Sequence, residues 1–327
     1  MKKKLTALGA LFAICLSMLA TDMVVKQKNG EIVRFDVSEV NEVIFSESNP
    51  GDTTVVDASE TPLEFKIISD STVEVTGVNK DSESIEIPSK VKIDGKVYTV
   101  NSIKYSAFSW KRSLTTLEIP SSITSIAESS VFSGSSKLKS INVASDNPNF
   151  SSVDGVLYNK DKTKIICVPG GIRGDFTIPS SVNCIGYSAF ENDSLTSVKI
   201  PSSVTKIGIY AFCGCQIMKS IDIPASVTEI EDGAFARCSN MTNINIASDN
   251  PNFITVDGVL YNKDTTELIS VPAGIEGKFV VPSTVKSIRG WSFWGSGFDL
   301  INVPSSVTNI GDGAFWNCMN IVIDNSS

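Results

Sequence analysis

Acidic residues and cysteines are the side chains of this sequence that could do chemistry, because its 327 residues include no histidine. Without histidine, neither a Ser-His-Asp nor a Cys-His arrangement can form, and the commonest general base is missing. Aspartates recur in two nearly identical stretches, as Asp146 and Asp154 and again as Asp249 and Asp257. Because Asp-Asn-Pro and Asp-Gly sequences favour turns, we interpret all of these as turn residues. Calcium binding and glycoside hydrolysis by a carboxylate pair are the alternatives that stay open.

The cysteines follow the spacing of a repeat rather than that of a metal or redox motif. Cys215, Cys238 and Cys318 each lie three residues after a phenylalanine, which predicts a buried ladder of small apolar side chains. Cys213-Gly-Cys215 has one intervening residue, which is not a usual zinc or thioredoxin-type spacing. We therefore predict no catalytic residues, no metal and no cofactor. Disulfide formation stays open for all six cysteines beyond the N-terminal segment: Cys167, Cys184, Cys213, Cys215, Cys238 and Cys318.

A repeated unit must position these residues. IPSSVTKIGIYAF, residues 200–212, returns as IPASVTEIEDGAF at 223–235 and as VPSSVTNIGDGAF at 303–315, with looser copies at 119–132 and 178–190. A longer stretch is also duplicated, because ASDNPNFSSVDGVLYNKD begins at residue 144 and ASDNPNFITVDGVLYNKD begins at residue 247. Short repeats are thus nested in a larger duplication. Repetition at such periods indicates a solenoid, in which each unit buries its apolar face against its neighbours.

The spacing of apolar residues inside the unit predicts its local structure. In LTSVKIP, residues 195–201, Leu195, Val198 and Ile200 are spaced as in the short parallel strand of a leucine-rich repeat, and Pro201 ends the strand. Further along the unit we expect Val204, Ile207 and Phe212 to be buried. The prediction is a β-rich leucine-rich-repeat solenoid of the α/β class, with short parallel strands, short helical turns and about nine rungs, preceded by a small β module.

The N-terminal segment, residues 1–20, predicts a secretory signal peptide. Three lysines precede an apolar run of about sixteen residues, which is short for a transmembrane helix of roughly twenty. Ile14 precedes Cys15, where a lipid-attached cysteine usually follows a small residue. We therefore favour cleavage near Ala20 over lipid attachment, and we expect the protein to be secreted or at the cell surface.

Four further segments follow. Residues 21–45 predict a short β module with a hairpin turn at Asn29-Gly30, and the polar residues 46–62 predict a linker. Residues 63–100 alternate in polarity and predict an N-terminal β cap for the solenoid, which occupies residues 101–327.

The repeat resembles a known family. IPSSVTxIGxxAFxxC, preceded by LxxVxIP, is similar to the BspA-type leucine-rich repeat of bacterial surface proteins, and the resemblance covers roughly residues 84–324. The NPNFxxVDGVLYNKD insert is typical of such proteins. The resemblance implies an exported surface protein that binds proteins, with adhesion to host matrix components and host recognition known for some members, and it implies no shared catalytic residues. Departures from the motif occur at Ser130-Val131 and at Trp291-Ser292.

Aromatic residues near the C-terminus are the candidate binding residues. Trp294 and Trp316 each directly follow the phenylalanine of a repeat, so we expect them side by side on adjacent rungs, with Trp291 and Phe298 in the same region. Exposed aromatic clusters are enriched in protein interfaces and can stack on sugars. The alternative is that these side chains fold over the last rung in place of a missing cap.

The sequence therefore predicts a non-enzymatic exported or cell-surface scaffold for protein interaction or adhesion, with proteins such as host matrix or surface proteins as partners. Glycan binding through the tryptophan cluster is the alternative. A net charge of −8 without a basic cluster argues against nucleic acid. The ligand, the mode of anchoring and the oligomeric state do not follow from the sequence.

Overall fold

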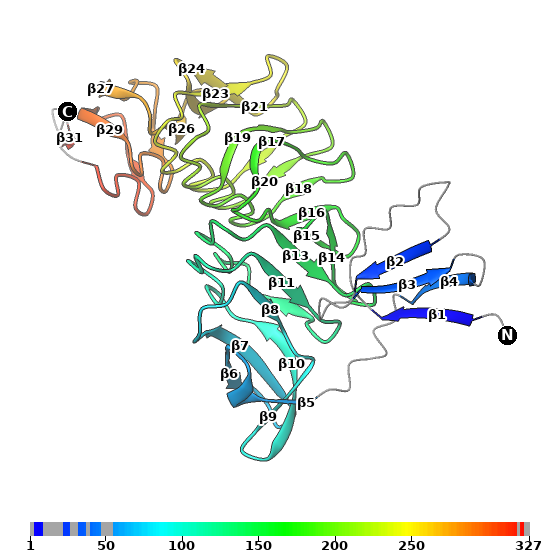
Figure 1. Cartoon of the computed structure of the whole chain (residues 1–327). Coiled ribbons are helices and arrows are strands. Elements are labelled where there is room, and N and C mark those ends of the chain that lie inside the picture. Colours follow the sequence, from blue (N-terminus) through cyan, green and yellow to red (C-terminus); the bar gives the residue numbers. More distant parts are fainter. Residues whose placement is uncertain are drawn as a thin grey trace. The chain divides into compact units, whose positions relative to one another are not determined.

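The structure is a computed structural model that describes residues 3–8, 22–26, 32–36, 40–46, 55–318 and 321–323 (Figure 1). The chain divides into two compact units, Met1–Thr54 and Val55–Ser327. Strands of the first unit pair in two ways: β1 (Lys3–Leu8) is parallel to β4 (Val40–Ser46), and β2 (Asp22–Lys26) is antiparallel to β3 (Ile32–Asp36). Most of the predicted signal peptide, with Cys15 and its cleavage region, lies outside the described residues. The division of the N-terminal hundred residues into four segments stays a prediction.

A sheet with the strand order β5-β9-β10-β7-β6 opens the second unit. Its elements are β5 (Val55–Asp57), the 3-10 helix η2 (Ala58–Glu60), β6 (Leu63–Ile67), β7 (Thr72–Val78), β9 (Lys90–Ile93) and β10 (Lys96–Ile103). β9 and β10 form a hairpin whose turn residues, Asp94 and Gly95, both have positive φ, as a type I′ turn requires. β10 also pairs in parallel with β12 (Ser125–Ile126), which belongs to a following turn of the solenoid. The sheet therefore covers the first turns of the solenoid.

The LxxVxIP segments form the first side of the solenoid, where short parallel strands stack turn upon turn (Figure 1). Each strand alternates in burial, as β11 shows by burying Leu117 and Ile119 and turning Glu118 away from the core. The strands are β8 (Ser84–Glu86), β11 (Thr116–Ile119), β13 (Ser140–Val143), β17 (Arg173–Thr177), β19 (Ser194–Lys199), β21 (Ser220–Ile223), β23 (Asn243–Ile246), β27 (Glu276–Val280), β29 (Gly297–Val303) and β31 (Ile321–Ile323).

The remaining two sides of each turn carry the second half of the motif. Two-residue parallel strands form the second side: β18 (Cys184–Ile185), β20 (Lys206–Ile207), β22 (Glu229–Ile230), β28 (Ser287–Ile288) and β30 (Asn309–Ile310). The third side is a tight turn that contains the motif phenylalanine, whose backbone N–H donates to a carbonyl of the next turn, as Phe190 does to Ala211 at 2.7 Å. The rings stack inside, with centroids 4.8 Å apart between Phe190 and Phe212 and 5.7 Å apart between Phe212 and Phe235.

The leucine-rich-repeat solenoid is confirmed, but two details of the prediction are wrong. The solenoid has about eleven turns rather than nine. The short helical turns are replaced by non-helical turns, and η2 is the one helix among residues 55–318. The cause is local: the residue two positions before the phenylalanine has positive φ, as in Ser188 (52°) and Tyr210 (54°), and a left-handed residue cannot continue an α-helix.

The two long units interrupt this regular stacking. Each inserts an antiparallel hairpin on the second side, formed by β14 (Phe150–Val153) and β15 (Val156–Asn159) in the first copy and by β24 (Phe253–Val256) and β25 (Val259–Asn262) in the second. The chain then continues as β16 (Lys164–Cys167) or β26 (Glu267–Ser270), which pairs in parallel with the next turn.

These long units lack the phenylalanine turn, so the third sides of the turns before and after them face each other. We call the contact between residues 126–135 and 185–193 the first seam, and the contact between residues 230–238 and 288–296 the second seam. Direct hydrogen bonds cross both, from Asn192 Nδ2 to Ser133 Oγ at 2.8 Å and from Arg237 N to Trp294 O at 2.9 Å. The seams are the two places where the repeat pattern does not dictate the contacts.

Candidate functional site

The structure brings three of the four predicted aromatic residues together. Ring centroids are 5.1 Å apart between Trp291 and Trp294 and 6.0 Å apart between Trp291 and Trp316. Phe298 is only 5% exposed and packs on Phe279 in the core, with ring centroids 5.2 Å apart. Phe298 therefore contributes to packing, whereas Trp316, which is 61% exposed, presents its ring to solvent.

The tryptophans extend across the second seam to residues that sequence reasoning missed. The ring of Tyr210 lies with its centroid 6.0 Å from those of both Trp291 and Trp294. The guanidinium of Arg237 lies over the Trp294 ring, 5.2 Å from its centroid, in a cation–π geometry. We call Tyr210, Arg237, Trp291, Trp294 and Trp316 the aromatic cluster. Tyr210 could have been predicted from its position in the repeat. It lies two residues before the motif phenylalanine, which is also the position of Trp291 in its own repeat.

Glycines on either side make room for these rings. A Cβ on Gly313 would lie 2.5 Å from the Trp291 ring, and a Cβ on Gly233 would lie 2.5 Å from the Tyr210 ring. Both glycines also have positive φ, 60° and 65°, which side chains rarely adopt. The GAF sequences in two copies of the motif thus allow the large side chains of the neighbouring turns to approach the backbone closely.

Charged residues hold both seams together, with the signs exchanged. At the second seam Arg289 donates to Glu267 Oε2 at 2.5 Å and to the Ile230 carbonyl at 2.6 Å, and its Nε lies 3.7 Å from Asp232 Oδ1. At the first seam Lys164, which corresponds to Glu267 in the duplication, pairs with Glu128 at 2.5 Å. The duplicated units have therefore evolved different side chains for the same joint.

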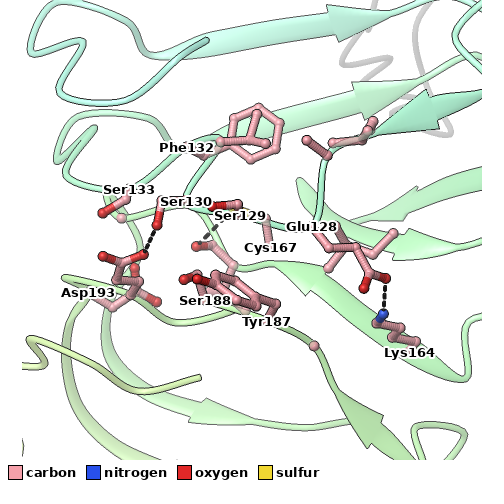
Figure 2. A pocket seen from close by; sticks show the side chains of 18 of the residues that line it. Glu128, Ser129, Ser130, Phe132, Ser133, Lys164, Cys167, Tyr187, Ser188 and Asp193 are labelled. Atoms are coloured by element: carbon pink, nitrogen blue, oxygen red, sulfur yellow. Dashed lines mark hydrogen bonds and ion pairs between the residues drawn. The ribbon is translucent and has the colours of Figure 1, made fainter. Parts of the chain in front are cut away.

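A cavity of about 80 Å³ lies at the first seam (Figure 2). Asp193 lines it and is only 3% exposed, and its Oδ2 has no hydrogen-bond partner among the described residues. Burial raises the pKa of the Asp193 carboxyl well above its usual range, and the nearby negative charge of Glu191 raises that pKa further. Glu191 also lines the cavity and accepts a hydrogen bond from Ser130 Oγ at 2.8 Å.

Asp193 departs from a rule that the structure reveals. It lies three residues after the motif phenylalanine, where four other turns carry a cysteine or serine that donates to the carbonyl of the preceding turn's phenylalanine. The donors and acceptors are Ser135 Oγ to Phe108 O (2.6 Å), Cys215 Sγ to Phe190 O (3.1 Å), Cys238 Sγ to Phe212 O (3.0 Å) and Cys318 Sγ to Phe293 O (3.1 Å). The cysteines of this ladder thus donate hydrogen bonds to buried carbonyls and also fill the core. An aspartate at the same position of the repeat, as at Asp193, could have been recognised in the sequence as a candidate functional residue.

All six cysteines beyond the N-terminal segment are free thiols in the structure. Burial raises the pKa of Cys213 and that of Cys167, the latter helped by the charges of Asp193 and Glu191. A raised pKa leaves little thiolate at neutral pH, and the thiolate is the reactive form. The buried cysteines therefore have the properties of structural residues.

The duplicated aspartates lie in turns. Asp154 and Gly155 have φ of 50° and 79°, and Asp257 and Gly258 repeat these values within a few degrees, so both pairs form the turn of an inserted hairpin. Within the described part of the chain, no group of three or more His, Cys, Asp or Glu side chains is arranged to hold a metal ion. Calcium binding by the inserts has no further support in the geometry.

Stacked parallel strands with inward leucine, isoleucine and valine, and a phenylalanine turn in each regular repeat, define a leucine-rich-repeat solenoid. The chain belongs to the family of the BspA type leucine rich repeat region, whose sequence model matches six copies over residues 80–173, 174–276 and 274–325. The resemblance drawn from the motif is thereby confirmed.

Solved structures of similar proteins come from bacteria. A leucine rich cell surface protein from Faecalibacterium prausnitzii A2-165 is 27% identical, with 80% of this chain and 74% of that chain covered and a TM-score of 0.45. A leucine-rich repeat protein from Eubacterium ventriosum ATCC 27560 is 25% identical, with 79% and 62% covered and a TM-score of 0.42. The pneumococcal vaccine antigen PcpA is 23% identical, with 83% and 70% covered and a TM-score of 0.47. No curated protein matches the sequence.

Across the described residues, no helix has the length and apolar character needed to span a membrane.

Proposed function

We propose that the protein is a non-enzymatic scaffold, exported or held at the cell surface, that binds other proteins through its repeat surface. Leucine-rich repeats generally mediate protein binding, and family membership supports this class of function. One observation carries the proposal: the aromatic cluster places tryptophan, tyrosine and arginine side chains together around Trp291 and Trp294, and the exposed ring of Trp316 packs beside Trp291. These three residue types are the ones most enriched at the energetic centres of protein interfaces.

The test combines capture of a partner with a matched tryptophan control. The secreted protein would be immobilised and probed with purified extracellular matrix and cell-surface proteins, and each captured protein would be titrated against Trp316→Ala. Trp110→Ala is the control, because Trp110 is exposed to a similar degree, 58%, but lies in a different turn. We expect Trp316→Ala to weaken binding at least tenfold, as a central interface residue does, while Trp110→Ala leaves it unchanged. Equal effects of the two variants would contradict the proposal.

Glycan binding is the second candidate, and the exposed face of Trp316 supports it because sugars stack on such rings. On a glycan array, the unaltered protein should then bind a defined set of glycans, and Trp294→Ala and Trp316→Ala should abolish that binding. Absence of glycan binding by the unaltered protein would eliminate this candidate.

Two further features of the proposal have direct tests. The absence of histidine supports a non-enzymatic role, and turnover of any member of a broad glycan and peptide panel would contradict it. The lysines and apolar run of residues 1–20 support export, so N-terminal sequencing of protein secreted by the cell should find a new terminus near Ala20. An intact Met1 on the secreted protein would contradict cleavage.

A further inference from the structure

The cavity at the first seam has a structural cause. The turn of β13 carries no phenylalanine turn on its third side, so residues 126–135 and 185–193 meet across the space that such a turn would fill. Apolar side chains of Phe132, Phe150 and Val168 form part of the wall. The lining also includes the exposed residue Glu128, which Figure 2 labels, so the cavity reaches the surface.

The charge inside this cavity is unbalanced. Asp193 and Glu191 line it, and neither takes part in an ion pair among residues 55–318. The one lysine in the lining, Lys164, is already paired with Glu128 at 2.5 Å. Ser188 adds a third polar atom, because its buried Oγ has no hydrogen-bond partner in the described part of the chain. Buried polar groups without partners are rare and costly, so Asp193 Oδ2 and Ser188 Oγ require an explanation beyond folding, whereas Glu191 is half-buried and already accepts a hydrogen bond from Ser130 Oγ.

The second seam shows that folding does not require these residues. In the duplicated unit, the positions of Asp193 and Glu191 are occupied by Ser296 and Trp294, and the position of Ser188 is occupied by Trp291. There the rings of the aromatic cluster pack across the joint. The same joint is thus closed by aromatic side chains in one copy and left as an acid-lined cavity in the other.

We propose that the first-seam cavity binds the ammonium group of an aliphatic amine. A primary ammonium carries three N–H donors, which matches the three acceptors offered by Asp193, Glu191 and Ser188, and its positive charge balances the acids. The apolar wall accommodates a methylene chain. A volume of about 80 Å³ is several times the ~10–15 Å³ that a cavity needs to hold one water, which leaves room for a short aliphatic chain.

Metal ions and anions fit the cavity less well. The described residues contain no set of three metal-ligating side chains. An anion would face two carboxyl groups with no free cation to hold it. The ammonium group can come from a free amine or from the lysine side chain of a partner protein, and the two sources present the same chemistry to the cavity.

Calorimetric titration of the secreted protein with n-butylammonium chloride tests the proposal, with Nα-acetyl-lysine methylamide as the second ligand. Sodium butyrate and 1-butanol control for the charge and for the chain. We expect butylammonium to bind and neither control to do so. Binding of the lysine derivative with similar affinity would assign the site to a protein side chain, and its failure beside butylammonium binding would assign the site to free amines. No binding of either amine at millimolar concentration would overturn the proposal.

Variants locate the binding. Asp193→Ser installs the residue that the second seam carries at the same place, so the fold tolerates it, and it should weaken amine binding at least tenfold. Asp264→Asn removes an exposed acid far along the chain and should leave binding unchanged. Glu191→Gln keeps the size of the side chain and provides a second variant should Asp193→Ser misfold. Unchanged affinity in either cavity variant that retains the unaltered protein's circular dichroism spectrum would also overturn the proposal.

Discussion

Replacing Asp193 by serine should stabilise the protein at neutral pH and much less at acidic pH. Burial, reinforced by the charge of Glu191, raises the pKa of this carboxyl in the folded state above its value in the unfolded chain. Between those two values the folded protein holds a proton that the unfolded protein has released. Protonation of Asp193 therefore contributes its full stabilisation of the folded state below the pKa of the unfolded chain, about 3.9. This contribution to the free energy of unfolding is lost as the pH rises through the pKa of the folded state.

The magnitude follows from the proton count and from the environment. One proton changes the unfolding free energy by at most about 1.4 kcal/mol per pH unit within that window. A buried polar group without a partner costs about 1–3 kcal/mol, and an ionised one costs more. We therefore expect Asp193→Ser to gain about 1–3 kcal/mol relative to the unaltered protein between pH 4 and pH 7. Glu191, Cys167 and Cys215 also face this carboxyl electrostatically, and all three remain in the variant.

The assay is urea denaturation followed by circular dichroism at unit steps from pH 4 to pH 8, on the unaltered protein, Asp193→Ser and Asp264→Asn. The difference between Asp193→Ser and the unaltered protein should widen with pH and then level off, whereas Asp264→Asn should follow the unaltered protein. A pH-independent difference, or a variant that loses stability as pH rises, would refute the reasoning.

Three other substitutions test the packing. Phe212→Ala removes a fully buried ring from the middle of the phenylalanine stack and should lower the free energy of unfolding by about 3–5 kcal/mol in urea denaturation; a loss below about 1 kcal/mol would contradict the stack as a core element. Gly313→Ala should destabilise the last turns and change tryptophan emission, since its Cβ meets Trp291 at 2.5 Å, and an unchanged spectrum would contradict that contact. Cys215→Ser keeps a donor for the Phe190 carbonyl, so it should be about 1 kcal/mol more stable than Cys215→Ala, and equal stabilities would show that the thiol's hydrogen bond contributes nothing.

The sequence was sufficient for the solenoid because each motif residue packs against copies of itself. Phe212 stacks on Phe190 and Phe235, the equivalent residues of the adjacent turns, so the period of the pattern determines its burial. The turns were less predictable. The sequence around Tyr210 is compatible with a short helix as well as with a tight turn. Only the observed φ of 54° at Tyr210 distinguishes the two.

The candidate site was predictable in part. The one-repeat spacing predicted Trp294 beside Trp316, whereas the observed ring contacts run through Trp291, which lies 5.1 Å from Trp294 and 6.0 Å from Trp316 between ring centroids. Tyr210 and Arg237 could not be found in that way, because they approach Trp294 across the second seam from far away in the sequence. Residues one repeat apart lie on neighbouring turns only where the turns are regular. At the inserted hairpins, turns that are more than one repeat apart in the sequence come into contact.

The seams are therefore where this scaffold can differ from other stacks of the same motif. Within the regular turns, few positions can change their side chain, because each must fit the equivalent residues of the turns before and after it. The strand register, the phenylalanine stack and the cysteine and serine donors to the phenylalanine carbonyls all impose this requirement. At a seam, each turn faces a partner with a different sequence. The duplication provides the comparison: Lys164 at one seam and Glu267 at the other occupy equivalent positions with opposite charges, and their partners, Glu128 and Arg289, come from different positions of the repeat. Because two unlike solutions close the same joint, the joint does not prescribe its side chains, and an unpaired buried acid such as Asp193 is best explained by what it binds.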